Sequence, residues 1–355
     1  MKKAILILAL FGIVFFVSSF KSTDASYEEI EIEYNEVLVN YYRNPQVDKI
    51  PVVLDHILQS NFFRDKATGI FTLTAYYFGR IARLEPALIP KYMEFFEKMS
   101  QKHEGRFFIL MVFQICGNET VKQFLVEKQN DKNFVNEKQD IQNILNGGAF
   151  PQFNPLTREI RDGADLDILW AEFFVTGNKE PILKIIDTLG WPDRFKSRLL
   201  DWSVKKHSNN EKRVLDRLLN QETRMNVDLD RMNIKDMTDL DCLFSAQLQF
   251  RQPDKKRRES IKKLRNILNI TDEDILYMVV KGAALWSLQS NAQQHPKVLE
   301  YCKQEFEKRN NRSKVELAII LEIVSKGTVE LIPTGEDDIV ELELKKSKSS
   351  GGEIK

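Results

Sequence analysis

The chain has 355 residues, in which 52 Lys and Arg balance 52 Asp and Glu. A net charge of zero produces no long-range field that would recruit a polyanion, so we expect no nucleic-acid ligand. The three cysteines, Cys116, Cys242 and Cys302, are too few and odd in number for a disulfide framework. We expect buried thiols, the alternative being one bridge between two of them.

The N-terminus has the pattern of a secretory signal peptide. Lys2-Lys3 precedes an apolar run over residues 4–17, and the small pair Ser18-Ser19 follows it. At about 14 residues, the run is shorter than the ~20 that a membrane-spanning helix needs. We therefore expect residues 1–22 to be a signal peptide that is removed, which makes the mature chain periplasmic or secreted. The alternative is an uncleaved N-terminal membrane tether through residues 4–20.

Apolar residues recur at spacings of three and four through most of the remaining chain, which is the period of an α-helix. In residues 23–146 this pattern predicts N-terminal helical hairpins, with helices over residues 47–58, 70–84, 88–99 and 107–116. The last of these helices ends at Gly117-Asn118. Residues 147–163 are predicted to be a loop boundary, because turn formers interspersed with aromatic residues occupy positions 146–155.

A helix, a tight turn and an antiparallel helix are predicted to follow the boundary. In the first helix, over residues 165–176, Trp170 and other apolar residues lie on one side while Glu172 lies elsewhere. Gly177-Asn178 breaks the pattern, and a glycine at this place suits a left-handed C-terminal cap. An apolar stripe over residues 182–189 predicts the second helix.

Two segments recur at a loose period. Ile115-Cys116-Gly117-Asn118 is echoed by Val175-Thr176-Gly177-Asn178, and Asp165-Leu166-Asp167 is echoed by Asp239-Leu240-Asp241. Helical hairpins that recur in this way stack on one another to bury their apolar stripes. We therefore predict an all-α fold, an irregular array of antiparallel helical hairpins that is α-solenoid-like, in which residues 164–326 form the C-terminal helical hairpins.

Further start signals place the helices of this C-terminal part. The basic run at residues 255–258 is interpreted as the solvated face of a helix, because apolar residues recur after it at helical spacing. Thr271 begins a capping-box pattern, Pro296 suits the first turn of another helix, and a last helix covers residues 315–324. Residues 327–355 are expected to form a small β-hairpin and a disordered tail.

The sequence lacks the strong catalytic signatures, including the Gly-x-Ser-x-Gly elbow, the phosphate-binding Gly-rich loop and the His-Glu-x-x-His motif. Its histidines are far apart in the chain, at His56, His103, His207 and His295. We therefore expect no metal, no cofactor and no catalytic residue. The acid pairs Asp165/Asp167 and Asp239/Asp241 are interpreted as helix caps. The alternative is an exported α/α-barrel hydrolase that uses a carboxylate pair on a polysaccharide.

The predicted binding site lies between two of the C-terminal helices. Trp286 offers an aromatic face there, and an expected inter-helix turn gathers hydrogen-bonding groups from Ser290, Asn291 and His295. Polar residues of a turn on a rigid scaffold are where recognition tends to lie. The alternative is that they are ordinary helix-ending and helix-starting residues. The remaining tryptophans are expected to be core aromatics, the alternative being that some line a concave groove: Trp170, Trp191 and Trp202.

The leader, the Asp-Leu-Asp-x-Leu segments that begin at Asp165 and Asp239, and the stretch from Trp286 to Cys302 resemble a group of uncharacterised bacterial exported α-helical proteins. More generally, residues 45–325 are similar to divergent αα-repeat proteins of the tetratricopeptide or HEAT kind. The resemblance implies an architecture and no functional residue. We expect an exported helical-repeat protein that binds or scaffolds another protein.

Overall fold

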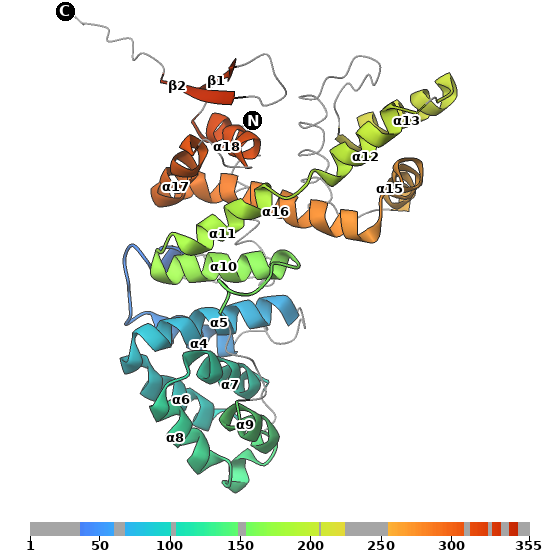
Figure 1. The fold of residues 1–355 in the computed structure, drawn as a ribbon. Coiled ribbons are helices and arrows are strands. Elements are labelled where there is room, and N and C mark those ends of the chain that lie inside the picture. The colour runs from blue at the N-terminus through green and yellow to red at the C-terminus, as the bar shows by residue number, and fades with distance from the viewer. Residues whose placement is uncertain are drawn as a thin grey trace, which may run out of the picture. The chain divides into compact units, whose positions relative to one another are not determined.

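The computed structural model describes residues 36–59, 68–100, 104–147, 154–205, 207–223, 255–308, 313–325, 329–334 and 341–346. Most of these residues are helical, so the predicted all-α class is confirmed (Figure 1). The predicted signal peptide, Cys242 and the Asp239/Asp241 pair lie outside the described residues, as do residues 347–355 of the predicted tail.

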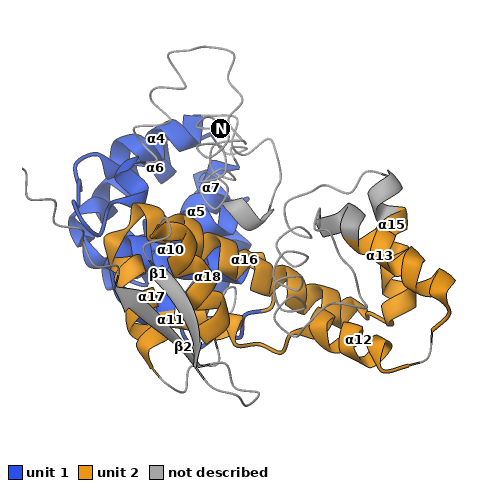
Figure 2. Ribbon diagram, turned by 90° about the horizontal axis from the view of Figure 1, so that it is seen from above, with its two compact units in different colours: residues 1–160, 164–182 blue, residues 161–163, 183–355 orange. Residues whose placement is uncertain are grey.

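The chain forms two compact units (Figure 2). Unit 1 contains residues 1–160 and 164–182, and unit 2 contains residues 161–163 and 183–355. This division falls within α11 (Glu180–Leu189), later in the chain than the predicted loop boundary at residues 147–163. The predicted grouping of residues 164–326 as one set of hairpins stays a prediction.

Unit 1 consists of helices that bury many aromatic side chains. Their bounds are α4 Ile50–Gln59, α5 Thr68–Leu84, the 3-10 turn Pro86–Leu88, α6 Ile89–Lys98, α7 Gly105–Cys116, α8 Glu119–Lys128, the 3-10 turn Lys132–Phe134, α9 Lys138–Leu145 and α10 Gly163–Thr176. Phe78, Phe96, Phe108 and Phe113 are buried between α5, α6 and α7. The rings of Phe96 and Phe113 lie 5.8 Å apart in an edge-to-face arrangement, which aromatic pairs favour.

The predicted helix ends at residues 116 and 176 are confirmed. Gly117 and Gly177 have φ angles of 61° and 65°, in the left-handed region that glycine adopts without a steric penalty. After the first of these glycines, the Asn118 side chain accepts a hydrogen bond of 2.7 Å from the Thr120 N–H and so caps α8. The sequence signal worked here because a helix end depends on local backbone geometry.

Unit 2 contains α12 Arg194–Ser203, α13 Asn209–Thr223, α15 Lys255–Leu268, α16 Asp272–Gln294, α17 Pro296–Glu307 and α18 Lys314–Val324. One of its apolar clusters joins α12, α13 and α15 through Phe195, Leu215 and Leu264. On α15, Lys262 and Lys263 are exposed while Leu264 is buried. The side chains of residues 255–258 lie outside the described ones, so the solvated face of that basic run stays a prediction.

The predicted starts of two helices are also confirmed. The Thr271 hydroxyl accepts a hydrogen bond from the Asp274 N–H, and the Asp274 carboxylate accepts one from the Thr271 N–H, which completes the capping box of α16. Pro296 is the first residue of α17. Proline has no backbone N–H, and an N–H at the first position of a helix would find no acceptor within that helix.

Two short strands follow the last helix. β1 (Val329–Thr334) and β2 (Glu341–Lys346) pair antiparallel, with Leu331 opposite Leu344. Residues 335–340, which would form the turn of the predicted β-hairpin, lie outside the described residues, so the hairpin stays a prediction. None of the helices in the described stretches combines the length and the hydrophobicity that a membrane crossing requires.

Candidate binding cavity

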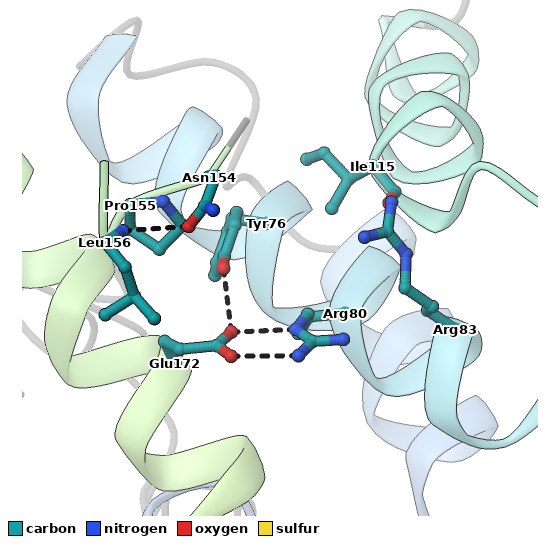
Figure 3. A pocket seen from close by; sticks show the side chains of 8 residues that line it. All are labelled: Tyr76, Arg80, Arg83, Ile115, Asn154, Pro155, Leu156 and Glu172. Atoms are coloured by element: carbon teal, nitrogen blue, oxygen red, sulfur yellow. Dashed lines mark hydrogen bonds and ion pairs between the residues drawn. The ribbon is translucent and has the colours of Figure 1, made fainter. Parts of the chain in front are cut away.

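A cavity of about 380 Å³ lies in unit 1 (Figure 3). Its walls come from α5, α7, α10 and the turn that begins at residue 154: Tyr76, Arg80, Arg83, Ile115, Glu172 and residues 154–156. Pockets for small organic groups typically measure about 300 to 1,000 Å³, so this cavity has room for one side chain or a comparable fragment.

Three residues of α5 form one wall of the cavity. Tyr76, Arg80 and Arg83 are separated by four and three positions, which places them on the same face of a helix. Elsewhere on α5, Gly79 lets α7 approach closely, because a Cβ atom there would lie 2.7 Å from both the Val112 carbonyl oxygen and the Ile115 Cβ. The missing side chain therefore brings Ile115 to the cavity.

The Glu172 carboxylate is held by two residues of α5. The Tyr76 hydroxyl donates to Oε2 at 2.7 Å, and Arg80 donates from Nε to Oε2 at 2.8 Å and from Nη2 to Oε1 at 2.9 Å. This bidentate geometry is the strongest that Arg makes with a carboxylate. Burial and the adjacent carboxylate raise the pKa of Tyr76, so its hydroxyl remains a donor at neutral pH. The hydrogen bonds to Glu172 raise the pKa of Arg80.

The sequence places Glu172 away from the apolar side of its helix, and the structure shows that α10 is buried there as well, since only 5% of the Glu172 surface is exposed. Burial of a charge is tolerated when the group is hydrogen-bonded and paired with an opposite charge. Arg80 supplies the charge from 92 positions earlier in the chain, and Tyr76 supplies a further hydrogen bond from 96 positions earlier. The only local signal is that Glu172 is the single charged residue in the run from residue 168 to residue 176.

Arg83 is fixed by the C-terminal end of α7. Its Nε donates to the Cys116 carbonyl at 2.9 Å, and its Nη2 donates to the Ile115 carbonyl at 2.5 Å. The last carbonyl groups of a helix receive no hydrogen bond from within the helix and carry partial negative charge. A guanidinium group that donates to them is therefore a favourable cap. The adjoining Gly117 turns the chain away and leaves room for it.

The facing wall of the cavity is a tight turn. The Asn154 Oδ1 accepts a hydrogen bond of 3.0 Å from the Leu156 N–H, the pattern of an Asx turn. Because the amide oxygen is engaged in this way, the amide nitrogen remains as the donor of that side chain. Figure 3 shows Asn154 and Leu156 on one side of the cavity and the two Arg side chains on the other.

The cavity therefore offers more hydrogen-bond donors than the protein itself uses. Arg80 Nη1, Arg83 Nη1 and Asn154 Nδ2 have no acceptor among the described residues. Two guanidinium groups face one carboxylate, which leaves the lining with a net positive charge. None of the eight lining residues is a Ser, Thr, Cys, His or Lys, so the lining is suited to holding an anionic group.

A second group of buried charges lies in unit 2. The Lys281 ammonium donates to the Asp193 carboxylate, to the Glu316 carboxylate at 2.6 Å and to the Trp191 carbonyl at 3.2 Å. Burial alone would lower the pKa of Lys281, but the two carboxylates outweigh it and raise that pKa. All three donor positions of the ammonium are engaged, so this group is a structural cross-link between α16, α18 and the start of α12.

The structure places the predicted binding residues differently from the expected turn. Ser290 and Asn291 belong to α16, which continues to Gln294, so the predicted extent of the inter-helix turn was wrong. The helix ends only at His295, because the residue before Pro296 is pushed out of helical geometry. Ser290, Asn291 and His295 are buried, and Trp286 is half-buried. Their binding role stays a prediction.

Of the predicted core tryptophans, two are buried and one is not. Trp170 and Trp202 have 5% and 7% of their surface exposed, which confirms their assignment to the core. Trp191 is half-buried and lies 4.9 Å from the Tyr277 ring. It therefore packs on a neighbouring aromatic ring while keeping part of its surface open.

The predicted helix-start acid Asp165 lies in the first turn of α10. It is buried and forms an ion pair with Arg158, whose Nε lies 3.0 Å from its Oδ1. A carboxylate near the N-terminus of a helix is favourable through the helix dipole, while its predicted role as a cap of the backbone N–H groups stays a prediction. The partner acids Asp239 and Asp241 lie outside the described residues, so the carboxylate pair of the hydrolase alternative stays a prediction.

Two of the three cysteines lie in described helices. Cys116 and Cys302 are buried free thiols. Burial raises the pKa of both, that of Cys302 to about 12 with a further contribution from Glu305. Within the described stretches, no cluster of three or more His, Cys, Asp or Glu side chains could hold a metal ion.

Comparison of the chain with models of known protein families, with curated proteins and with solved structures gave no match.

Proposed function

We propose that this chain is an exported helical-repeat protein that acts as a protein-binding or scaffolding module in the periplasm or outside the cell. We propose further that its helices belong to an irregular, α-solenoid-like array of antiparallel hairpins that ends in a small β-hairpin. The αL glycines that end α7 and α10 support this architecture, since the same turn recurs in the two echoed segments. The apolar run after Lys2-Lys3 supports export.

The observation that carries the binding role is the set of donors in the unit 1 cavity. The guanidinium groups of Arg80 and Arg83 are held by Glu172 and by α7, and each keeps one nitrogen without an acceptor in the described chain. Donors that are already fixed in place lose little side-chain entropy when a partner binds. The cavity is therefore the contact site that we propose for the partner.

A photo-crosslinking experiment tests this proposal. Leu156, at the cavity, and Val204, which is 83% exposed in unit 2, would each be replaced by a photoreactive phenylalanine analogue in the mature chain. After illumination in an envelope extract, we expect a discrete protein adduct from position 156 that position 204 does not give.

Two results would contradict the proposal: the absence of any protein adduct from position 156, and identical adducts from both positions. The second result would indicate adhesion to exposed surface rather than recognition at the cavity. Val204 is exposed, as Leu156 is, but it does not line the cavity. Circular dichroism of both variants before illumination verifies that they are folded.

A further inference from the structure

We propose that the unit 1 cavity binds the C-terminal carboxylate of a partner polypeptide together with the apolar side chain of its last residue. This inference rests on the partner binding proposed above and names the chemical group that the cavity recognises. It uses the charge, the donors and the apolar surface of the lining residues, each of which selects against other ligands.

The charge of the lining favours an anion with a single charge. Arg80 and Arg83 contribute two positive charges, and Glu172 cancels one of them through its bidentate contact with Arg80. A carboxylate neutralises the one that remains. A phosphate dianion would bring a second negative charge close to Glu172, which is disfavoured where little water screens the repulsion.

The donors of the cavity suit a planar group that accepts hydrogen bonds. Arg80 Nη1 and Arg83 Nη1 lie on the α5 side, and Asn154 Nδ2 lies on the facing side (Figure 3). The two oxygens of a carboxylate offer about four lone-pair positions, enough for three donors from different directions. Because Glu172, the α7 carbonyls and the Asx turn already hold these side chains, the donors need little rearrangement.

The apolar part of the lining indicates what accompanies the carboxylate. Ile115, Pro155 and Leu156 line the same cavity, and Leu156 is 37% exposed. A simple inorganic anion would leave this surface in contact with water. In the last residue of a polypeptide, the carboxylate and an apolar side chain are attached to the same carbon atom, so both parts of the lining are covered at once.

The test uses the mature full-length chain and N-terminally labelled Gly/Ser octapeptides that end in Leu. Binding is measured by fluorescence anisotropy for the peptide with a free C-terminal carboxylate, for the same peptide with a C-terminal amide, and for an amidated peptide ending in Glu. The last peptide separates a terminal carboxylate from a side-chain carboxylate. Phenyl phosphate serves as a competitor that carries an aromatic group and a phosphate.

Asn154→Asp is the informative variant, and Asn118→Asp is its matched control. Each Asn accepts a backbone N–H through Oδ1, which an Asp oxygen can also do, so both turns are retained. Only Asn154→Asp replaces a cavity donor with a negative charge. We expect it to weaken binding of the free-carboxylate peptide by about tenfold or more, while Asn118→Asp changes binding less than about twofold. Leu156→Asp, at the exposed edge of the cavity, is the second variant and is expected to act in the same direction.

Equal binding of the amidated and free-carboxylate peptides would overturn the inference, and so would binding of the Glu peptide as tight as that of the free-carboxylate peptide. Stronger competition by phenyl phosphate than by the unlabelled free-carboxylate peptide would also overturn it. The same holds if the Asn154→Asp and Asn118→Asp variants bind the free-carboxylate peptide with the same affinity. Failure of every peptide to bind would also overturn it. A specific adduct from position 156 would then still support partner binding, so the two proposals fail separately.

Discussion

At the residue scale, Arg106, Glu172 and Lys281 are buried charged side chains with partners of opposite charge. Arg106 lies 3.2 Å from Glu137, Glu172 accepts both arms of Arg80, and Lys281 joins two carboxylates. Removing one member of such a group leaves an uncompensated charge, which is more damaging than loss of an exposed pair. Single-residue effects in this protein therefore depend more on what a side chain is paired with than on its type.

Gly79→Ala is expected to destabilise unit 1. A helix interior normally favours Ala over Gly by about 1 kcal/mol. At this position the added methyl group would lie 2.7 Å from the Val112 carbonyl oxygen and the Ile115 Cβ, so overpacking dominates. We expect a net loss of about 2 kcal/mol in the free energy of unfolding, measured by urea denaturation.

Gly163→Ala is the matched control for Gly79→Ala, because nothing lies within 4 Å of a Cβ atom built at Gly163. We expect it to change the free energy of unfolding by less than about 0.5 kcal/mol. Equal stability of the two variants would show that α5 and α7 do not cross as closely as described.

Asp274→Asn is expected to show a pH-dependent loss of stability. Burial alone would raise the pKa of Asp274, but hydrogen bonds from the Thr271 N–H and Arg198 outweigh it and lower that pKa. A lowered folded-state pKa means that the ionised form stabilises the fold above the ordinary Asp pKa of about 4. That contribution is lost as the pH falls through the folded-state pKa.

At pH 7 we expect Asp274→Asn to cost about 1–2 kcal/mol in urea denaturation, and the difference from the unmodified chain to shrink as the pH falls below about 4. Asp272→Asn is the control, since Asp272 is exposed in the same helical turn and its contact with Arg265 is expected to contribute under about 1 kcal/mol. A pH-independent difference for Asp274→Asn would contradict the assigned role of its charge.

At the scale of elements, helix boundaries could be predicted because they depend on neighbouring residues. The ends of α7 and α10 at Gly117 and Gly177, and the capping box at Thr271, were all visible in the sequence. Ser290 and Asn291 are predicted to lie in a turn because their helix propensity is only moderate. In the structure they belong to α16, where their burial outweighs that weak preference. Local signals thus locate a helix boundary where a glycine cap or a capping box marks it.

The cavity could not be predicted, because its contacts join residues that are far apart in the sequence. Tyr76 and Arg80 read as ordinary helical residues until α10 supplies Glu172, and Arg83 depends on where α7 ends. No spacing rule connects α5 with α10. The sequence places Arg80 and Arg83 on one helical face, but only the packing of unit 1 shows that this face lines a cavity.

Lys281→Met tests how α16 is joined to α18 and to the start of α12. The substitution removes the shared cation and leaves the Glu316 and Asp193 carboxylates facing each other, so we expect a loss of about 3–5 kcal/mol in the free energy of unfolding. Thermal and urea denaturation provide the measurement.

Lys308→Met is the control for Lys281→Met, because Lys308 contacts Glu305 in a pair whose lysine is 58% exposed. A loss under about 1 kcal/mol is expected for it. The idea of a structural cross-link would fail if Lys281→Met proved no more destabilising than Lys308→Met.

At the scale of the whole molecule, the fold and the leader give separate information. The helices of the two compact units are described from residue 36 on, whereas residues 1–22 lie outside the described residues. Location therefore depends on the apolar run over residues 4–17, and no feature of the units substitutes for it.

Leu8→Arg tests the proposed export. A charge in the middle of a short apolar run opposes its transfer into the membrane, so we expect the variant to stay unprocessed inside the cell. The unmodified chain should be recovered outside the inner membrane and lack its leader by mass spectrometry. Thr23→Arg, just past the predicted leader, is the control and should be exported and processed. Export and processing of Leu8→Arg would contradict the proposal.

The burial of Cys302 has a consequence for the proposed export. Thiolates are the species that oxidants attack, and a thiol whose pKa is raised to about 12 is almost entirely protonated at neutral pH. The folded chain can therefore persist among oxidants with this sulfur unmodified. Modification of Cys302 by an alkylating dye would report the moment at which the surrounding helices open.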